Sequence, residues 1–487
     1  MHKILFGTMF SLLLLSTSCD LDKFPEDSIT TETAWQSISD ADKFRNGMYG
    51  TFMAVNGGIY TYIPDYQTDV LNATISFSNR GGDIYRWDFT SSQYDIEDTY
   101  EYNYECINNC NNIIQNIDKI VIEDADEQAR ADMIKGEAYL IRALCYHTLV
   151  VRFAKDYEPS SATSDLGMPL VLEMDPEGKP SRATLEETYK QIKSDISESR
   201  KLLKTEGSAN AIYMTTDVID AFEARVDLYM HNYSEAITLA KKIIAKYPLI
   251  SSEDELASMW LNDKGSEIIF KVFMSQDERN TNQEMQYYLN YNTGAGLFSP
   301  DFVPTKWVVD LYEDNDIRKQ VYFIEDSVVC NSTKVGGIYL LNKYPGNPEL
   351  KTSTYQYYQM PKIFRAAESY LIAAEAAYNE GNTSEALGYV NSLRSARQAS
   401  TLNVNGEAVL KAIKDEWIRE FIGEGYRLND LKRWHDGFSR HDTQTPSIIM
   451  SGANYNEKTV SADDQRFVWE IPANDLKANS NLVPNWK

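Results

Sequence analysis

The chain has 487 residues, of which 72 are acidic and 47 basic, giving a formal charge of −25. Such an acidic surface disfavours binding to nucleic acid or to anionic lipid, and no basic cluster offsets it. The length would allow about three domains. The helical patterning nevertheless continues to the C-terminus without a Pro/Gly/Ser-rich linker, so we expect one large α-rich body.

The N-terminus has the pattern of a secretory leader followed by a lipid attachment site. Residues 1–18 contain one lysine and an apolar run too short to span a bilayer, which predicts a signal peptide. Small residues before Cys19 predict lipidation of that cysteine. Because Leu15 stands one position further from the cysteine than in most lipoprotein signals, an ordinary secretory signal is the alternative. The acidic, proline-bearing residues 19–30 are predicted to be an extended tether.

The body, residues 31–487, is predicted to be all-α with a few short strands. Helical hairpins are expected over about 101–250 and 362–435, where apolar residues recur at three- and four-residue steps. Irregular, loop-rich stretches are expected over about 57–100 and 255–360. Individual helices are predicted at 30–53, 102–117, 128–154 and 184–203, and short β-like runs at 268–273 and 321–324.

Two segments repeat one helical hairpin unit. Ala224 and Ala236 are twelve residues apart, as are Ala374 and Ala386, and each second alanine ends a Ser-Glu-Ala triplet. With Pro248 after the earlier copy, this spacing is typical of a tetratricopeptide (TPR) hairpin. Such a hairpin cannot bury its apolar face alone, so we expect further hairpins to stack on it. An amphipathic hairpin of another all-α protein is the alternative.

Local signals place the ends of some of these helices. Thr184 is followed three residues later by Glu187, and Asn382 by Glu385, and both patterns predict a capped helix start. Gly381 suits the left-handed position that ends the preceding helix.

No catalytic or cofactor-binding motif is present. The sequence lacks HExxH, GxSxG, Walker A and Gly-rich dinucleotide patterns, and its five histidines show no ligand spacing. We therefore expect no enzymatic activity and no cofactor. A zinc site of Cys106, Cys110, Cys145 and His147 can be drawn, but a cysteine within a helix is more often a small buried apolar residue.

The C-terminal part of the chain carries the motifs of a known family. The motifs are Arg419-Glu420-Phe421, Glu424-Gly425, Arg427, Asp430-Leu431, Arg433-Trp434, Trp469-Glu470-Ile471-Pro472, Asn481-Leu482 and Asn485. They resemble the hallmark helix pair and closing tail of the SusD/RagB family, nutrient-binding outer-membrane lipoproteins of Bacteroidetes. Residues 137–143 and 391–397 are also similar. Trp417 stands where the family usually has arginine, a departure that bears on packing.

This resemblance implies a fold and a setting. TPR-like hairpins would form a scaffold on one side, and loops and small helices a ligand face on the other. The partner implied is a TonB-dependent SusC-like barrel, on which the lipoprotein sits as a lid. The chain is then expected in the outer membrane, anchored through Cys19 and facing the cell exterior. Arg419, Glu424 and Arg427 are expected to form structural ion pairs outside the ligand site.

The family's ligands are mostly oligosaccharides and, in some members, peptides. A sugar offers a face of C–H groups and a rim of hydroxyls, which aromatic rings and Asn, Asp or Arg side chains recognise. The two loop-rich stretches supply both kinds of residue. The candidate ligand residues are Trp87, Tyr85, Tyr66, Asn79, Arg80 and Asp83 in the first stretch, and Tyr287, Tyr291, Phe298, Asn290 and Asn292 in the second.

Three alternatives remain open from the sequence. Each candidate aromatic could instead pack in a loop or in the scaffold. The ligand could be a peptide, because Asn and Tyr hydrogen-bond an extended backbone as readily as a hydroxyl rim. A TPR-type adaptor lipoprotein without a glycan ligand would also explain the repeats, although it leaves the tyrosine-rich stretches unexplained. That the two stretches share one surface is a hypothesis.

Overall fold

The computed structural model describes residues 34–175, 177–279, 285–440 and 442–486. The predicted signal peptide, Cys19 and the tether lie outside the described residues. Within the described ranges, none of the helices combines the length and the apolar character needed to cross a bilayer.

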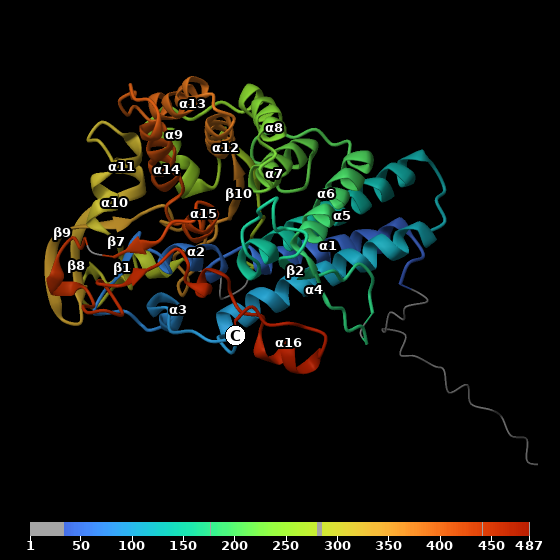
Figure 1. Ribbon diagram of the computed structural model, residues 1–487, viewed down its shortest axis with the longest axis horizontal. Helices are drawn as coiled ribbons and strands as arrows, with labels where there is room; N and C mark the ends of the chain where they lie inside the picture. Colours follow the sequence, from blue (N-terminus) through green and yellow to red (C-terminus); the bar gives the residue numbers. More distant parts are fainter. Residues whose placement is uncertain (1–33, 176, 280–284, 441, 487) are drawn as a thin grey trace, which may run out of the picture.

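The protein is predominantly helical with short strands, as predicted (Figure 1). The helices are α1 (Ile38–Val55), α2 (Ile59–Tyr66), α3 (Gly82–Arg86), α4 (Tyr94–Asn116), α5 (Ala125–Phe153), α6 (Leu185–Leu202), α7 (Thr216–Tyr229), α8 (Tyr233–Lys246), α9 (Glu253–Asn262), α10 (Lys306–Asp310), α11 (Ile317–Tyr322), α12 (Ala366–Asn379), α13 (Thr383–Ala396), α14 (Glu407–Phe421), α15 (Arg427–Arg433) and α16 (Ala473–Ala478). The strands are β1 (Leu71–Ala73), β2 (Leu166–Pro169), β3 (Arg182–Thr184), β4 (Ile268–Lys271), β5 (Tyr291–Asn292), β6 (Leu297–Phe298), β7 (Phe302–Pro304), β8 (Phe323–Cys330), β9 (Thr333–Leu341), β10 (Lys362–Arg365), β11 (Phe438–Ser439) and β12 (Thr459–Val460).

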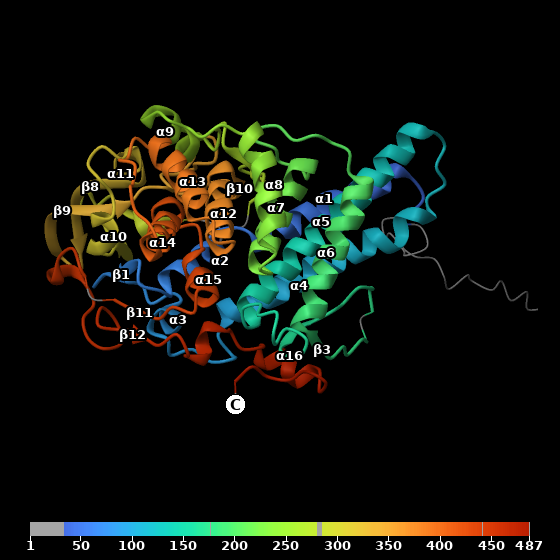
Figure 2. The same ribbon diagram turned by 45° about the horizontal axis from the view of Figure 1, so that its top comes forward.

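The long helices form a continuous stacked scaffold. Helices α1, α4, α5 and α6 pack side by side, and the α7–α8 and α12–α13 hairpins continue the stack through contacts between α8 and α12 (Figures 1 and 2). Helix α14 then packs against α12 and α13. The alanines of the repeated unit, Ala224, Ala236, Ala374 and Ala386, are fully buried in one cluster. The TPR-like hairpin arrangement predicted from their spacing is therefore confirmed.

The predicted helix ends are also present. Thr184 and Glu187 form a reciprocal capping box at the start of α6. The Asn382 side chain accepts a hydrogen bond from the Glu385 backbone N–H at the start of α13. Gly381 has a φ of 82°, the left-handed conformation that ends α12. These caps satisfy backbone donors that the first helical turn leaves unpaired.

Three boundaries differ from the sequence prediction. Helix α1, predicted to start at residue 30, begins at Ile38 after its N-cap Ser37. Helix α4 starts at Tyr94, well before residue 102, because its first turns carry tyrosines and acids that do not form a regular apolar stripe. The predicted strand at 321–324 is divided, since its first two residues end α11 and the next two begin β8. The β8–β9 hairpin was not predicted as a unit. Its two turn residues, Asn331 and Ser332, have φ angles of 43° and 69°, the left-handed pair that a tight hairpin needs.

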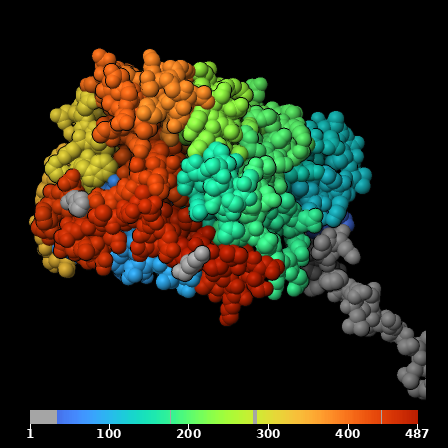
Figure 3. All heavy atoms as spheres, viewed as in Figure 1, coloured from blue at the N-terminus to red at the C-terminus, as the bar shows by residue number. Residues whose placement is uncertain are grey.

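The two loop-rich stretches meet on the side of the molecule away from the hairpins. Strand β1 from the first stretch pairs antiparallel with β7 from the second, with Leu71 opposite Pro304 and Ala73 opposite Phe302. Strands β5, β6, β8 and β9 form a small sheet beside them (Figure 1). The C-terminal residues cover the lower part of the face in Figure 3, against the blue residues of the first stretch.

The hallmark charged residues form buried ion pairs. Arg419 pairs with Glu416 at 2.8 Å, and Arg427 pairs with Asp69 at 2.8 Å. Glu424 accepts from both Lys343 at 2.6 Å and Arg365 at 2.7 Å. The prediction that these residues form ion pairs is confirmed. The Arg419 pair lies within α14, whereas the pairs of Arg427 and Glu424 join this region to segments distant in sequence.

Candidate functional site

An open hollow lies where the two loop-rich stretches meet. Its volume is about 440 Å³, and its lining residues are Ser78, Asn79, Arg80, Tyr287, Asn290 and Asp301. Four of the eleven candidate ligand residues named from the sequence line it, two from each stretch. The structure therefore brings the two stretches together at one surface, in a hollow walled mainly by polar side chains.

The loop before α3 presents Arg80 at this surface. Asn79 and Gly81 have φ angles of 63° and 64°, so the chain reverses sharply around Arg80. The loop also lies directly on Tyr66, since a Cβ added at Gly81 would fall 2.0 Å from the Tyr66 hydroxyl oxygen. Glycine is therefore required there both for its backbone conformation and for the close approach.

The Arg80 guanidinium is exposed and has no carboxylate within ion-pair distance among the described residues. It donates a hydrogen bond to the Tyr287 hydroxyl, and its central carbon lies 5.7 Å from the centroid of that ring. The opposite wall is Asp301, whose carboxylate accepts from the backbone N–H of Ser78 at 3.1 Å and from the Ser78 hydroxyl. Burial raises the pKa of Asp301, and the bonds from Ser78 and the charge of Arg80 oppose that rise. The hollow thus offers a cation and hydrogen-bonding groups of both kinds.

Exposed aromatic rings flank the hollow. Tyr291 is 48% exposed, follows the lining residue Asn290, and contacts the Phe298 ring edge-on at a centroid distance of 5.3 Å. Tyr94, at the first position of α4, is 51% exposed. Its hydroxyl is close enough to Arg80 and Tyr287 for both to influence its pKa, which burial raises. Tyr94 was not singled out from the sequence, because the apolar pattern did not predict that α4 begins there.

Three candidate rings are not at this surface, and their assignment as ligand-stacking residues is corrected. Trp87, Tyr85 and Tyr66 are 1%, 0% and 1% exposed. The Trp87 indole lies against Phe467 and donates to the Gln67 carbonyl oxygen. Burial of these rings removes their apolar area from water, so all three rings stabilise the hydrophobic core.

Tyr85 and Tyr66 are also packed in the core. The Tyr85 ring lies 3.8 Å from the Arg440 guanidinium carbon, and the Tyr85 hydroxyl accepts from the Ala73 N–H at 3.0 Å. The Tyr66 ring stacks on Phe302 at 5.1 Å. The competing interpretation, packing in the fold, holds for all three candidate rings.

The remaining candidates lie near the hollow without lining it. Asp83 is paired with Arg86 at 2.6 Å. The Asn292 side chain accepts from the Ala295 N–H at 2.9 Å, which shapes the turn between β5 and β6. Phe298 is half-buried behind Tyr291.

Comparison with known proteins identifies relatives of this chain. Residues 329–486 match the model of the SusD family, and residues 21–228 match a SusD-like model described as starch-binding associating with outer membrane. SusD-like protein P38 of Formosa agariphila is 24% identical over 499 residues, covering 88% of this chain and 90% of that protein. The starch-binding protein SusD of Bacteroides thetaiotaomicron is 32% identical over 123 residues, covering 25% of this chain and 20% of that protein.

Solved structures share the fold across nearly the whole chain. A SusD superfamily protein from Bacteroides thetaiotaomicron superposes with a TM-score of 0.79 and 27% identity, covering 93% of this chain and 100% of its own. A putative sugar binding protein from Bacteroides vulgatus superposes with a TM-score of 0.75 and 26% identity, covering 93% and 99%. Together with the hairpin scaffold and the hallmark motifs of this chain, these matches show that the chain belongs to the SusD-like family.

Proposed function

We propose that this protein binds oligosaccharide or polysaccharide fragments at the open hollow and delivers them to a TonB-dependent SusC-like outer-membrane transporter. The observation that carries the proposal is the exposed Arg80, which has no ion-pair partner among the described residues and donates to the Tyr287 hydroxyl. The exposed tyrosines Tyr94 and Tyr291 are close to residues of the same hollow. Ring faces beside a fork of N–H donors match the C–H face and hydroxyl rim of a sugar.

Relatives support the same ligand class. One relative is named a starch-binding protein, and one structural neighbour is described as a putative sugar binding protein. We further infer a lipid anchor at Cys19, a location in the outer membrane facing the cell exterior, and binding without catalysis. The acidic overall charge disfavours nucleic acid and anionic lipid as ligands.

The test is a binding survey followed by variants. An array of glycans and peptides would first identify a ligand for the purified protein. Titration calorimetry would then compare the wild type with Arg80→Ala and Tyr291→Ala, and with Tyr213→Ala as a control that removes a similarly exposed tyrosine, 45% exposed, ahead of α7. Loss of a charged hydrogen bond predicts affinity roughly tenfold or more lower for Arg80→Ala. Binding of peptides alone, or full affinity in both site variants, would refute the glycan site.

The delivery step needs a separate measurement. Co-purification of this protein with a SusC-like barrel encoded beside it, and loss of glycan uptake when the protein is deleted, are the expected results. Uptake that continues at the wild-type rate without the protein would count against a role in delivery.

A further inference from the structure

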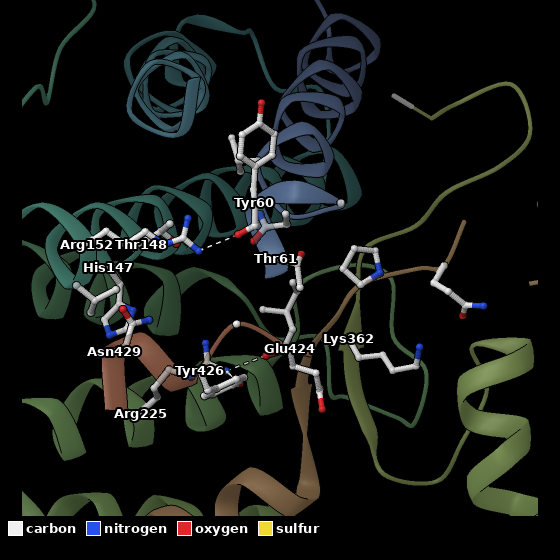
Figure 4. A pocket seen from close by; sticks show the side chains of 18 of the residues that line it. Tyr60, Thr61, His147, Thr148, Arg152, Arg225, Lys362, Glu424, Tyr426 and Asn429 are labelled. Atoms are coloured by element: carbon white, nitrogen blue, oxygen red, sulfur yellow. Dashed lines mark hydrogen bonds between the residues drawn. The ribbon is translucent and has the colours of Figure 1, made fainter. Parts of the chain in front are cut away.

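A second pocket lies between α2, α5, α7 and β10 (Figure 4). Its volume is about 140 Å³, and it shares no lining residue with the open hollow. A volume of this kind holds on the order of ten water molecules or one compact solute. Figure 4 shows Arg152, Thr148 and His147 along one wall and Lys362 on the opposite side.

Arg152 is the unusual group in this pocket. Its Nη2 donates to the Tyr60 carbonyl oxygen at 2.9 Å. Its Nε and Nη1 are buried and have no hydrogen-bond partner among the described residues, and no charged group there offsets the effect of burial on its pKa. Burial without a nearby carboxylate lowers the pKa of Arg152 to about 10. Buried N–H groups of a guanidinium cost free energy when they lack hydrogen-bond acceptors, unless a ligand or solvent supplies them.

Two other arginines show how this fold satisfies a buried guanidinium without a carboxylate. Arg182 donates from each of its three nitrogens, to the carbonyl oxygens of Gly167 and Phe153 among others and to the Asn485 side chain. Arg440 likewise donates from every nitrogen to backbone carbonyl oxygens. Arg152 differs from both, because two of its nitrogens are left without an acceptor in the protein.

The other charged groups around the pocket are already paired. Arg225 binds Glu368 through two hydrogen bonds, of 2.6 and 2.7 Å. Lys362 pairs with Asp263 at 2.7 Å, and Glu424 pairs with Lys343 and Arg365 as described above. His147 is neutral near pH 7, because burial and then the charges of Arg225 and Lys432 lower its pKa to about 3. Arg152 is therefore the uncompensated charge among the described lining residues.

Other polar atoms of the lining also lack hydrogen-bond partners. The buried donors without partners are Trp260 Nε1 and Gln359 Nε2, in addition to the two nitrogens of Arg152, and His147 Nε2 is also unpartnered. The unpartnered acceptors are Gln359 Oε1 and Asn429 Oδ1. Donors outnumber acceptors, so the complementary solute is rich in oxygen and negatively charged.

We propose that this pocket is a binding site for a compact oxyanion, a carboxylate or sulfate group, anchored by the guanidinium of Arg152. Both groups can accept two parallel N–H bonds from one edge of a guanidinium. Each edge of Arg152 joins Nη2, which has a second N–H beside the one given to Tyr60, to the unpartnered Nε or Nη1. This anion site is distinct from the proposed glycan site, because the two share no lining residue and the anion site selects a negatively charged ligand.

The first test is titration calorimetry of the purified protein with sodium sulfate and with sodium glucuronate, at an ionic strength held constant with sodium chloride. Saturable binding of at least one anion is expected; which of them binds distinguishes the two sources of oxyanion. Arg152→Met should weaken that binding at least tenfold while leaving an apolar side chain beside Trp469, whose ring centroid lies 5.4 Å from the Arg152 guanidinium carbon. Arg130→Met, which removes a surface arginine of the same helix, should bind the anion as the wild type does.

Absence of saturable binding by either anion, or equal affinity in Arg152→Met, would overturn the proposal. If Arg152→Met does not fold, a selenate soak of wild-type crystals decides instead. An anomalous peak within hydrogen-bond distance of the Arg152 guanidinium is the expected result, and an empty pocket at saturating selenate would refute the site.

Discussion

The indole Nε1 of Trp417 donates a hydrogen bond to Glu375 Oε2 at 3.0 Å, which joins α14 to the second TPR-like hairpin. Glu375 also accepts from Trp434 Nε1 at 2.9 Å and from Arg433 Nη2 at 2.8 Å. Trp417 stands where the family motif usually has arginine, and here an indole supplies the N–H donor. The ring is 3% exposed, so the substitution adds apolar area to the core as well as keeping a donor.

Glu375→Ala should strongly destabilise the fold, because it removes the acceptor of two indole N–H groups and leaves Arg433 with only its pair to Asp430. Breaking a buried ion pair from one side costs about 3–5 kcal/mol. Denaturant unfolding followed by tryptophan fluorescence would measure the loss. Glu380→Ala, an exposed position after the same helix, should change the free energy of unfolding by less than about 0.5 kcal/mol. Similar values for the two variants would contradict the role given to Glu375.

Trp87→Ala should act on stability, since the ring belongs to the core. Removing a fully buried tryptophan costs about 3–5 kcal/mol. Tyr291→Ala, at an exposed ring, should unfold like the wild type and should lower ligand affinity, by about 0.5–1.5 kcal/mol for a lost ring contact. Thermal unfolding together with ligand titration separates the two effects. Wild-type stability in a folded Trp87→Ala protein would show that the ring is not packed as described.

These two rings show what the sequence could predict and what it could not. The hairpins were predictable, because the alanine spacing and the caps at Thr184 and Asn382 are local signals. The hallmark ion pairs were predictable through the family motif. The division of the aromatics between core and surface was not, because Trp87 and Tyr291 occupy similar loop-rich sequence. Their burial depends on contacts with residues far along the chain, such as Phe467 against Trp87.

Asp95, which lies behind the hollow at the start of α4, should make stability depend on pH. Burial, reinforced by the nearby Asp98, raises its pKa from 3.8 to about 7. Between those values the folded protein holds a proton that the unfolded chain has released, so this group's contribution to stability is lost as pH rises through about 7. Asp95→Asn should therefore unfold at a higher temperature than the wild type at pH 8, by roughly 1–3 °C.

The same variant should show a smaller gain at pH 5, where only part of the loss between pKa 3.8 and about 7 has occurred. Calorimetric scans between pH 5 and pH 8 would measure the difference. A constant offset between the two proteins across that range would mean that Asp95 does not titrate near neutrality.

Cys19→Ala should release the protein from the membrane fraction, because the lipid is predicted to attach to that sulfur. Among the described residues, no helix is long and apolar enough to cross a bilayer. Fractionation with immunoblotting, and mass spectrometry of the mature N-terminus, would test this. An unmodified N-terminus at a different residue in the wild type would support the ordinary secretory signal instead.

The central claim is that the hollow between the two loop-rich stretches is the ligand site. A crystal structure of the wild-type protein with an array-identified glycan tests it most directly. The account predicts a sugar ring against Tyr291 or Tyr94, with its hydroxyls hydrogen-bonded to Arg80 and Asn290. A glycan bound elsewhere, with the hollow around Arg80 filled only by solvent, would contradict it.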